Sequence, residues 1–231
     1  MTNKEAIILA GGFGTRLQGV VKDVPKPMAP VNGRPFLTYV LDYLIDYQYT
    51  KVILSVGYLH EKVEEYFGSS YKSLDISYAV ETEPLGTGGG IAYAMSFCDC
   101  DNILVINGDT LFKANLFALE QFHAKSQTQL SIVLRHVADT SRYGSVSIDG
   151  DGHILCFTEK NNATGEGDIN GGIYLINKNL LQEIHPPKKF SFEKDLMEKY
   201  VRKMYFYAMR SDGYFIDIGI PEDYARAQRE F

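Results

Sequence analysis

A glycine-rich turn follows the first apolar run of the chain. Residues 6–10 are continuously apolar, and Gly11, Gly12 and Gly14 come directly after them. Glycine has no Cβ, so the backbone N–H groups of such a turn can approach a phosphate closely. The turn matches neither of two familiar phosphate loops, because Leu17 replaces the third glycine of the dinucleotide fingerprint and a Walker A lysine is missing. Taken alone, a glycine turn is more often an ordinary turn than a phosphate site.

Positive charge gathers just after this turn. Between Arg16 and Arg34 there are four basic residues and one acidic residue, although the formal net charge of the chain is −6. Such a local concentration favours an anion-binding site. Lys26 lies between Pro25 and Pro27, which fix φ and stiffen the backbone around it. A lysine that only faces solvent needs no such rigidity, so Lys26 is a candidate phosphate ligand.

Two aspartates are candidate metal ligands. Asp109 comes soon after the apolar run 103–106, at the carboxyl end of a predicted strand, where open α/β sheets bind ligands. Asp217 lies inside the apolar run 214–218, where an unpaired carboxylate would be costly and a cation would relieve that cost. Magnesium favours one or two carboxylates together with phosphate oxygens and water. The alternative for Asp109 is a turn residue or a helix cap.

The spacing of apolar residues predicts the elements that would position these side chains. Continuous apolar runs at 6–10, 52–56 and 103–106 are typical of strands covered on both faces of a parallel sheet. Helical spacing between and after them predicts helices at 36–45, 59–67 and 86–97. After about residue 128 the pattern predicts strands at 130–137, 143–148, 154–159, 171–176 and 205–208, and helices at 180–185, at 192–201 and from Pro221. One doubly wound α/β domain covering 1–231 is the economical interpretation.

The composition excludes several classes of protein. With 231 residues, 45% hydrophobic and 23% charged, the chain is typical of a globular protein rather than a disordered one. Its net negative charge argues against nucleic acid as the main partner. No apolar run approaches the ~20 residues that cross a bilayer and no signal peptide is evident, so we expect a cytoplasmic protein. Cys98, Cys100 and Cys156 form no CxxC pair, and we expect them to be small buried side chains.

Several segments resemble the signature of the sugar nucleotidyltransferases, also called nucleoside-diphosphate-sugar pyrophosphorylases. They cover the chain from end to end in the order of that family: LAGGFGTRL and PKPMAPVNGRPFL within 9–37, ETEPLGTGGG from Glu81, NGDT from Asn107, RYGSV from Arg142, FTEK from Phe157, NGGIY from Asn170 and FIDIGIPEDY from Phe215. The resemblance implies a Rossmann-like, doubly wound mixed sheet in a single domain. Residues 1–128 would form its nucleotide-binding half and residues 129–231 its sugar-phosphate-binding half.

The resemblance also implies a reaction. A nucleoside monophosphate would pass from a nucleoside triphosphate to a sugar 1-phosphate, with release of pyrophosphate. A sugar phosphate has a second pKa near ~6, so the nucleophile is mostly dianionic at neutral pH and needs no general base. The five histidines, at 60, 123, 136, 153 and 185, accordingly all lie outside the motifs. The chemical problem is to bring two anions together, which calls for cations, Mg²⁺ and rigid donors.

Each matching residue takes a role from the resemblance. Arg16 would hold the leaving pyrophosphate, Lys26 the α-phosphate, and Asp109 and Asp217 the Mg²⁺. The residues that would bind the nucleotide are Leu9, Gly11, Gly12, Gly14, Thr15, Glu81, Gly86 and Thr87. Those that would bind the sugar phosphate are Tyr143, Gly144, Glu159, Lys160, Asn170, Gly171 and Gly172, with Lys160 on the phosphate and Glu159 on the hydroxyls. A surface charge is the alternative for each lysine.

The choice of base depends on Glu81, where thymidylyl members of the family carry glutamine. A carboxylate can only accept hydrogen bonds, and guanine offers two adjacent donors whereas uracil and thymine offer one. We therefore expect GTP, although Glu81 could instead be a solvated edge residue and some uridylyl members are also acidic here. The short guanylyl members favour a manno-heptose 1-phosphate as the sugar, for synthesis of a surface polysaccharide or S-layer glycan. Mannose 1-phosphate, and N-acetylmuramate 1-phosphate with UTP, are the alternatives.

A binding protein without catalysis is the alternative of another class. The fold could serve as a nucleotide-sugar-binding regulatory subunit in which catalytic residues have been lost. The candidate residues Arg16, Lys26, Asp109, Lys160 and Asp217 are all present, which favours the enzyme. A homodimer is compatible with either interpretation.

Overall fold

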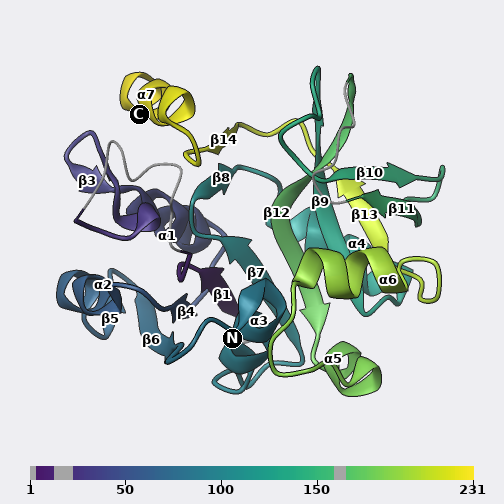
Figure 1. Cartoon of the computed structure of the whole chain (residues 1–231), viewed down its shortest axis with the longest axis horizontal. Coiled ribbons are helices and arrows are strands. Elements are labelled where there is room, and N and C mark those ends of the chain that lie inside the picture. Colours follow the sequence, from purple (N-terminus) through teal and green to yellow (C-terminus); the bar gives the residue numbers. More distant parts are fainter. Residues whose placement is uncertain (1–3, 13–22, 159–164) are drawn as a thin grey trace.

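The computed structural model describes residues 4–12, 23–158 and 165–231, and its centre is a ten-stranded sheet (Figure 1). The strands of this sheet are β1 (Glu5–Leu9), β4 (Lys51–Val56), β5 (Ser70–Tyr71), β6 (Leu74–Val80), β7 (Asn102–Asn107), β9 (Leu130–Val137), β10 (Ser145–Ile148), β11 (Ile154–Thr158), β12 (Gly167–Asn177) and β13 (Tyr207–Arg210). Their order is β11-β10-β12-β7-β1-β4-β6-β5, with β9 paired to β12 and to β13. Two short antiparallel pairs lie outside the sheet, β2 (Pro30–Val31) with β3 (Arg34–Pro35) and β8 (Thr110–Phe112) with β14 (Phe215–Asp217).

Helices cover both faces of the sheet. They are α1 (Phe36–Asp46), α2 (His60–Phe67), α3 (Gly86–Met95), α4 (Leu116–Ser126), α5 (Asn179–Ile184), α6 (Glu198–Tyr200) and α7 (Pro221–Glu230), with the 3₁₀ turn η1 (Lys26–Met28) and the π-helical turn η2 (Phe192–Met197). Consecutive residues of one strand point to opposite faces. Ile8 therefore packs in a core with α1, α4 and α7, whereas Ile7 packs in a second core with α3 and η2. The predicted doubly wound fold is confirmed.

The sheet is mixed. The strands β1, β4, β6 and β7 are parallel neighbours, and β12 pairs with β7 in the antiparallel sense. Figure 1 shows α1 and α2 toward one end of the molecule and β10, β11 and α6 toward the other, with β7 and β12 between them.

Strand β12 forks at the middle of the molecule. Its residues Ile173–Asn177 pair with β7, whereas Ile169 pairs with β10 on the same side. The register with β9 shifts between Asn170 and Tyr174, which indicates a bulge. Gly172 lies in this bulge with φ at +74°, a conformation that favours glycine. The fork opens the sheet next to the end of β7.

The sequence-based boundaries were wrong in a few places. The stretch 192–201 is not one α-helix but the π-helical turn η2 followed by the short α6, and the strand expected at 205–208 begins at Tyr207. The helix α4 and the strand β6 were not anticipated. Cys98 is buried as expected, but Cys100 and Cys156 are only partly buried. Within the described part of the chain, no helix is long and apolar enough to cross a bilayer.

Candidate active site

A cavity of about 680 Å³ opens at the carboxyl ends of β1, β4 and β7. These strands are parallel neighbours, so the turns that follow them meet at one edge of the sheet. Six residues predicted to bind the nucleotide line the cavity: Leu9, Gly11, Gly12, Glu81, Gly86 and Thr87. Two others, Gly14 and Thr15, lie outside the described residues, as does Arg16.

Glu81 is fixed in the wall of this cavity. The Ser55 hydroxyl donates to its Oε1 at 3.1 Å, and the Leu85 backbone N–H donates to its Oε2 at 3.0 Å. A Cβ added at Gly90 would stand 2.7 Å from Oε1, so the glycine-rich start of α3 leaves room for the carboxylate. Each carboxylate oxygen has a second lone-pair site. The two bonds therefore orient the side chain, which can still accept further hydrogen bonds. A solvated edge residue would not need to be held in this way.

Lys26 extends from η1 into the same cavity. Its ammonium lies 2.5 Å from Oδ2 of Asp109, and the Lys26 side chain is 11% exposed. The expected rigidity has a local basis, because the Met28 and Ala29 N–H groups bond back to the carbonyls of Pro25 and Lys26 at 2.8 and 3.0 Å. Lys26 is thus a largely buried cation held against a carboxylate, not a solvated surface lysine.

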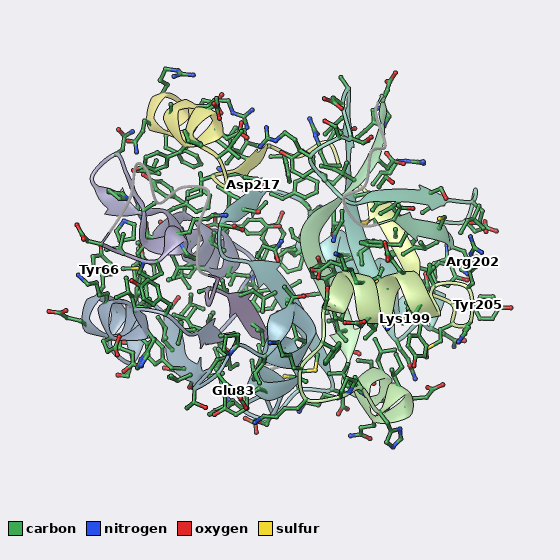
Figure 2. All side chains as sticks on the ribbon, viewed as in Figure 1. Tyr66, Glu83, Lys199, Arg202, Tyr205 and Asp217 are labelled. Carbon is green, nitrogen blue, oxygen red and sulfur yellow. The ribbon has the colours of Figure 1, made fainter. Side chains whose placement is uncertain are left out.

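Asp109 and Asp217 are brought together from distant parts of the chain. Thr110 of β8 pairs with Asp217 of β14, and the Ile218 N–H donates to the Asp109 carbonyl at 3.0 Å. A Cβ added at Gly219 would stand 2.7 Å from Asp217 Oδ1 and 3.3 Å from Lys26 Nζ, so these two side chains converge on one point. Figure 2 shows Asp217 on β14 near the middle of the molecule. Both aspartates therefore line one cavity, and their binding of a metal ion stays a prediction.

A second cavity, of about 130 Å³, lies at the fork of β12. All five described residues that were predicted to bind the sugar phosphate line it, namely Tyr143, Gly144, Asn170, Gly171 and Gly172. Both candidate metal ligands, Asp109 and Asp217, line it as well. Glu159 and Lys160, the other two predicted sugar-phosphate residues, lie outside the described residues.

The polar groups of this second cavity are held in place. The Asn170 side chain donates to the Tyr174 hydroxyl at 2.7 Å and accepts from the Gly172 N–H at 3.1 Å. Burial, and next the negative charge of Asp217, raise the pKa of the Tyr143 phenol, which therefore stays protonated at neutral pH. The phenol of Tyr143 can thus donate a hydrogen bond beside the aspartates.

Other lining residues were not predicted to belong to the site. Ser55 orients Glu81 but belongs to no motif, and Asn107 was recognised only as part of a motif. Glu193 lines both cavities and belongs to none of the motifs, although it lies within the helix predicted at 192–201. A single glutamate within a helical pattern carries no local signal of function.

No histidine among the described lining residues borders either cavity. His123, for example, is buried against Ser131 Oγ at 2.9 Å, and desolvation lowers its pKa to about 4. The polar groups of the described part of the site are therefore backbone groups, amides, hydroxyls, carboxylates and Lys26, which is consistent with chemistry that needs no imidazole base.

The sequence matches known proteins over nearly its whole length. The family model described as nucleotidyl transferase matches residues 5–231. The D-glycero-alpha-D-manno-heptose 1-phosphate guanylyltransferase of Aneurinibacillus thermoaerophilus is 46% identical, covering 98% of this chain and 97% of that protein. The protein of the same name from Campylobacter jejuni is 42% identical over 95% and 96% of the two chains. The mannose-1-phosphate guanylyltransferase of Mycobacterium tuberculosis is 34% identical, but this chain covers 64% of it.

Solved structures of related proteins have the same fold as this chain. The crystal structure of HddC from Yersinia pseudotuberculosis superposes with a TM-score of 0.88 at 38% identity and 99% coverage of both chains. The same protein complexed with GMP-PN gives a TM-score of 0.86. A UDP-glucose pyrophosphorylase shares the fold, with a TM-score of 0.85 at 20% identity. With a family model that spans the chain and relatives of equal length, this protein belongs to the nucleotidyl transferase family.

Proposed function

We propose that this protein transfers GMP from GTP to D-glycero-α-D-manno-heptose 1-phosphate, forming the GDP-sugar and releasing pyrophosphate. The observation that carries the proposal is the 46% and 42% identity, over nearly all of both chains, to two proteins of that name. The second candidate sugar is mannose 1-phosphate, favoured by the 34% identical relative that acts on it by name. In either case the nucleotide lies in the larger cavity and the sugar phosphate in the smaller one.

Glu81 selects guanine in this proposal. Ser55 and the Leu85 N–H hold the carboxylate, and its remaining lone pairs accept from the two donors on the Watson–Crick edge of guanine. A pyrimidine with one donor would leave part of this carboxylate unsatisfied, which disfavours UTP and dTTP.

Cations and backbone groups bind the phosphates. Lys26 donates to the α-phosphate, where charge accumulates during transfer, and Arg16 holds the leaving pyrophosphate. Gly11 and Gly12 border the same cavity, and their backbone N–H groups can approach the phosphates without a Cβ in the way. The ion pair with Asp109 holds the Lys26 side chain in the cavity before substrate arrives.

Asp109 and Asp217 are the residues that would hold Mg²⁺. Within the described ranges, no group of three or more His, Cys, Asp or Glu side chains could hold a metal ion. Two adjacent carboxylates fit Mg²⁺ provided that substrate phosphate oxygens and water complete its ligands. When bound, the ion would neutralise charge on the phosphates and hold them in line for transfer.

The sugar 1-phosphate acts as the nucleophile. It is already a dianion near neutral pH, and no histidine borders either cavity in the part of the chain that the structure describes. Tyr143 and Asn170 are donors that can orient the sugar hydroxyls or the phosphate. Lys160 offsets the charge of the incoming phosphate, and Glu159 accepts from sugar hydroxyls. We further propose that the enzyme works in the cytoplasm.

Pyrophosphate release tests this proposal. The protein would be incubated with Mg²⁺ and each of GTP, UTP, CTP, ATP and dTTP, in combination with heptose, mannose and N-acetylmuramate 1-phosphates. We expect release with GTP, fastest with the manno-heptose 1-phosphate. A clear preference for UTP would overturn the role of Glu81. Tight binding of GDP-sugars without any release would favour the regulatory subunit.

A further inference from the structure

Glu193 occupies the junction of the two cavities. Three described residues line both cavities, Asn107, Asp109 and Glu193. Asn107 is the last residue of β7 and Asp109 follows it closely, at the edge proposed to bind the nucleotide. Glu193 instead comes from η2, in the second half of the chain, and neither of the two proposed substrate-binding sets includes it.

The carboxylate of Glu193 is oriented by the first half of the chain. The Thr87 hydroxyl of α3 donates to Glu193 Oε2 at 2.6 Å, and the Ser191 hydroxyl donates to the same oxygen at 3.0 Å. The Thr87 hydroxyl also accepts from the Phe192 N–H at 2.9 Å. Among the described residues, Glu193 Oε1 accepts no hydrogen bond. One oxygen is therefore fixed, and the other is available to a ligand in the cavities.

The start of α3 also contacts the segment before Glu193 through its backbone. The Gly88 N–H donates to the Phe190 carbonyl at 3.0 Å, and the Phe190 N–H donates to the Leu85 carbonyl at 3.0 Å. A Cβ added at Gly88 would stand 2.1 Å from the Phe190 ring, so glycine permits the close approach. The segment that carries Glu193 is thus attached to α3 by backbone bonds as well as by Thr87.

The chemistry of the carboxylate limits what it can bind. A carboxylate accepts hydrogen bonds, binds cations and repels phosphates. Among the described residues, no group of three or more His, Cys, Asp or Glu side chains could hold a metal ion, so the ligand that Glu193 meets is a hydroxyl or amide donor. The base, ribose and triphosphate must extend from Glu81 to Lys26, and both residues line the larger cavity. The smaller cavity contains neither of them, so it holds the other substrate. Glu193 borders that cavity as well as the larger one, so its carboxylate is within reach of a sugar bound there.

We propose that Glu193 is a specificity-determining residue that accepts a hydrogen bond from a hydroxyl group of the sugar 1-phosphate, and that Thr87 is its positioning residue. This inference rests on the proposed guanylyltransferase activity. It gives the Thr87 hydroxyl a role toward the sugar rather than toward the nucleotide.

Steady-state kinetics with both substrates test the inference. For Glu193→Ala, the loss of a hydrogen bond to a charged group should lower kcat/KM for the sugar 1-phosphate about 10- to 100-fold. The KM for GTP should stay within about threefold. Glu193→Gln, which keeps an acceptor but loses the charge, should give a smaller loss of kcat/KM for the sugar. This variant keeps the test decisive if the alanine variant fails to fold. Glu198→Ala, on the same helical stretch but outside both cavities, is the matched control and should behave like the unmodified protein.

Thr87 variants separate positioning from packing. Thr87→Val removes the hydroxyl at nearly constant volume and should reproduce most of the kcat/KM loss for the sugar, whereas Thr87→Ser should restore it. Equal activity of the valine and serine variants would reject the positioning role.

A series of sugar 1-phosphates, each lacking one hydroxyl, identifies the bonded group. For the unmodified enzyme, one of these analogues should lower kcat/KM about 10- to 100-fold relative to the complete sugar. For Glu193→Ala, kcat/KM with that analogue should be little lower than with the complete sugar. The assignment of Glu193 would be overturned if every analogue lowered kcat/KM equally in the two enzymes. It would also be overturned if Glu193→Ala lowered kcat/KM for GTP more than kcat/KM for the sugar 1-phosphate. Absence of pyrophosphate release by the unmodified enzyme would instead reject the proposed function, and this inference with it.

Discussion

In the proposed mechanism, phosphate binding depends most directly on Lys26. Replacing it with alanine removes a largely buried ammonium from the point where Asp109 and Asp217 converge. By analogy with the removal of one preorganised donor at a reaction centre, kcat for pyrophosphate release should fall roughly 10²- to 10³-fold. Circular dichroism should remain unchanged, and Lys62→Ala, an exposed lysine on α2, should keep full activity. An unchanged kcat for Lys26→Ala would remove this lysine from the mechanism.

Glu81 should control the choice of base. Glu81→Gln replaces an acceptor by an amide whose NH₂ would face either the Ser55 hydroxyl or the Leu85 N–H, both of which now donate. We expect kcat/KM for GTP to fall about 10- to 100-fold, because one guanine donor and one protein donor lose their acceptor. The kcat/KM for UTP should fall much less. Equal losses for the two nucleotides would mean that Glu81 only supports the cavity wall.

The individual site residues could be predicted where a motif gives them a chemical context. Fourteen predicted residues of the described part line one or both cavities, including Asp109 and Asp217, which are more than 100 residues apart in the sequence. Ser55 and Glu193 could not be predicted in this way. Their roles arise from contacts with Glu81 and Thr87 that exist only once β4, α3 and η2 are packed together.

The sequence pattern predicted strands well where both faces of the strand are buried, and helices well where the apolar stripe is wide. The strands β1, β4 and β7 and the helix α1 were predicted on this basis. The helix α4 was missed because its buried apolar residues are few and Phe117, on the same helix, is exposed, so no wide apolar stripe marks it. The strand β6 was missed because the strands of the first half were expected as continuous apolar runs, whereas LDISYAV begins with alternating apolar and polar residues. The fork in β12 depends on partners on both sides, which no local pattern can show.

The bulge of β12 should be the most sensitive backbone feature of the site. At Gly172, with φ at +74°, an added Cβ would stand 2.6 Å from Nδ2 of Asn107. Gly172→Ala should therefore lower the free energy of unfolding by about 1–3 kcal/mol, measured by urea denaturation, and should also lower activity by displacing Asn107. Gly150→Ala is the matched control, since an added Cβ there meets nothing within 4 Å. Similar losses in both variants would show that the bulge is not strained against side chains.

Stability of the complete fold should depend on pH through His123. Desolvation lowers its pKa to about 4 in the folded chain, from about 6.5 in an unfolded chain. The unfolded chain therefore binds a proton at a pH where the folded chain does not. The stability linked to neutral His123 is fully present above about pH 6.5 and is lost as the pH falls toward 4, by on the order of 3 kcal/mol.

Urea midpoints measured between pH 7 and 4.5 check this dependence. His123→Gln should flatten the decline, whereas His185→Gln, at an exposed position, should leave it unchanged. An identical decline in both variants and in the unmodified protein would assign the acid sensitivity to other groups.

The molecule as a whole brings two halves of one sheet around a shared junction. The first half supplies Glu81 and Lys26, the second supplies Asp217, Asn170 and Glu193, and the fork of β12 joins the two cavities at the end of β7. This arrangement suits a reaction in which two phosphorylated molecules must meet despite their mutual repulsion. It also explains why no single motif of the sequence describes the site.

The most direct test is to follow a mixture of GTP, D-glycero-α-D-manno-heptose 1-phosphate, Mg²⁺ and the protein by ³¹P NMR. We predict that the signals of the sugar phosphate and of GTP decline together, while the diphosphate signals of a GDP-sugar and inorganic pyrophosphate appear in equal molar amounts. Mass spectrometry of the product should give the GDP-heptose. Persistence of the sugar phosphate signal, or breakdown of GTP without a GDP-sugar, would contradict the account.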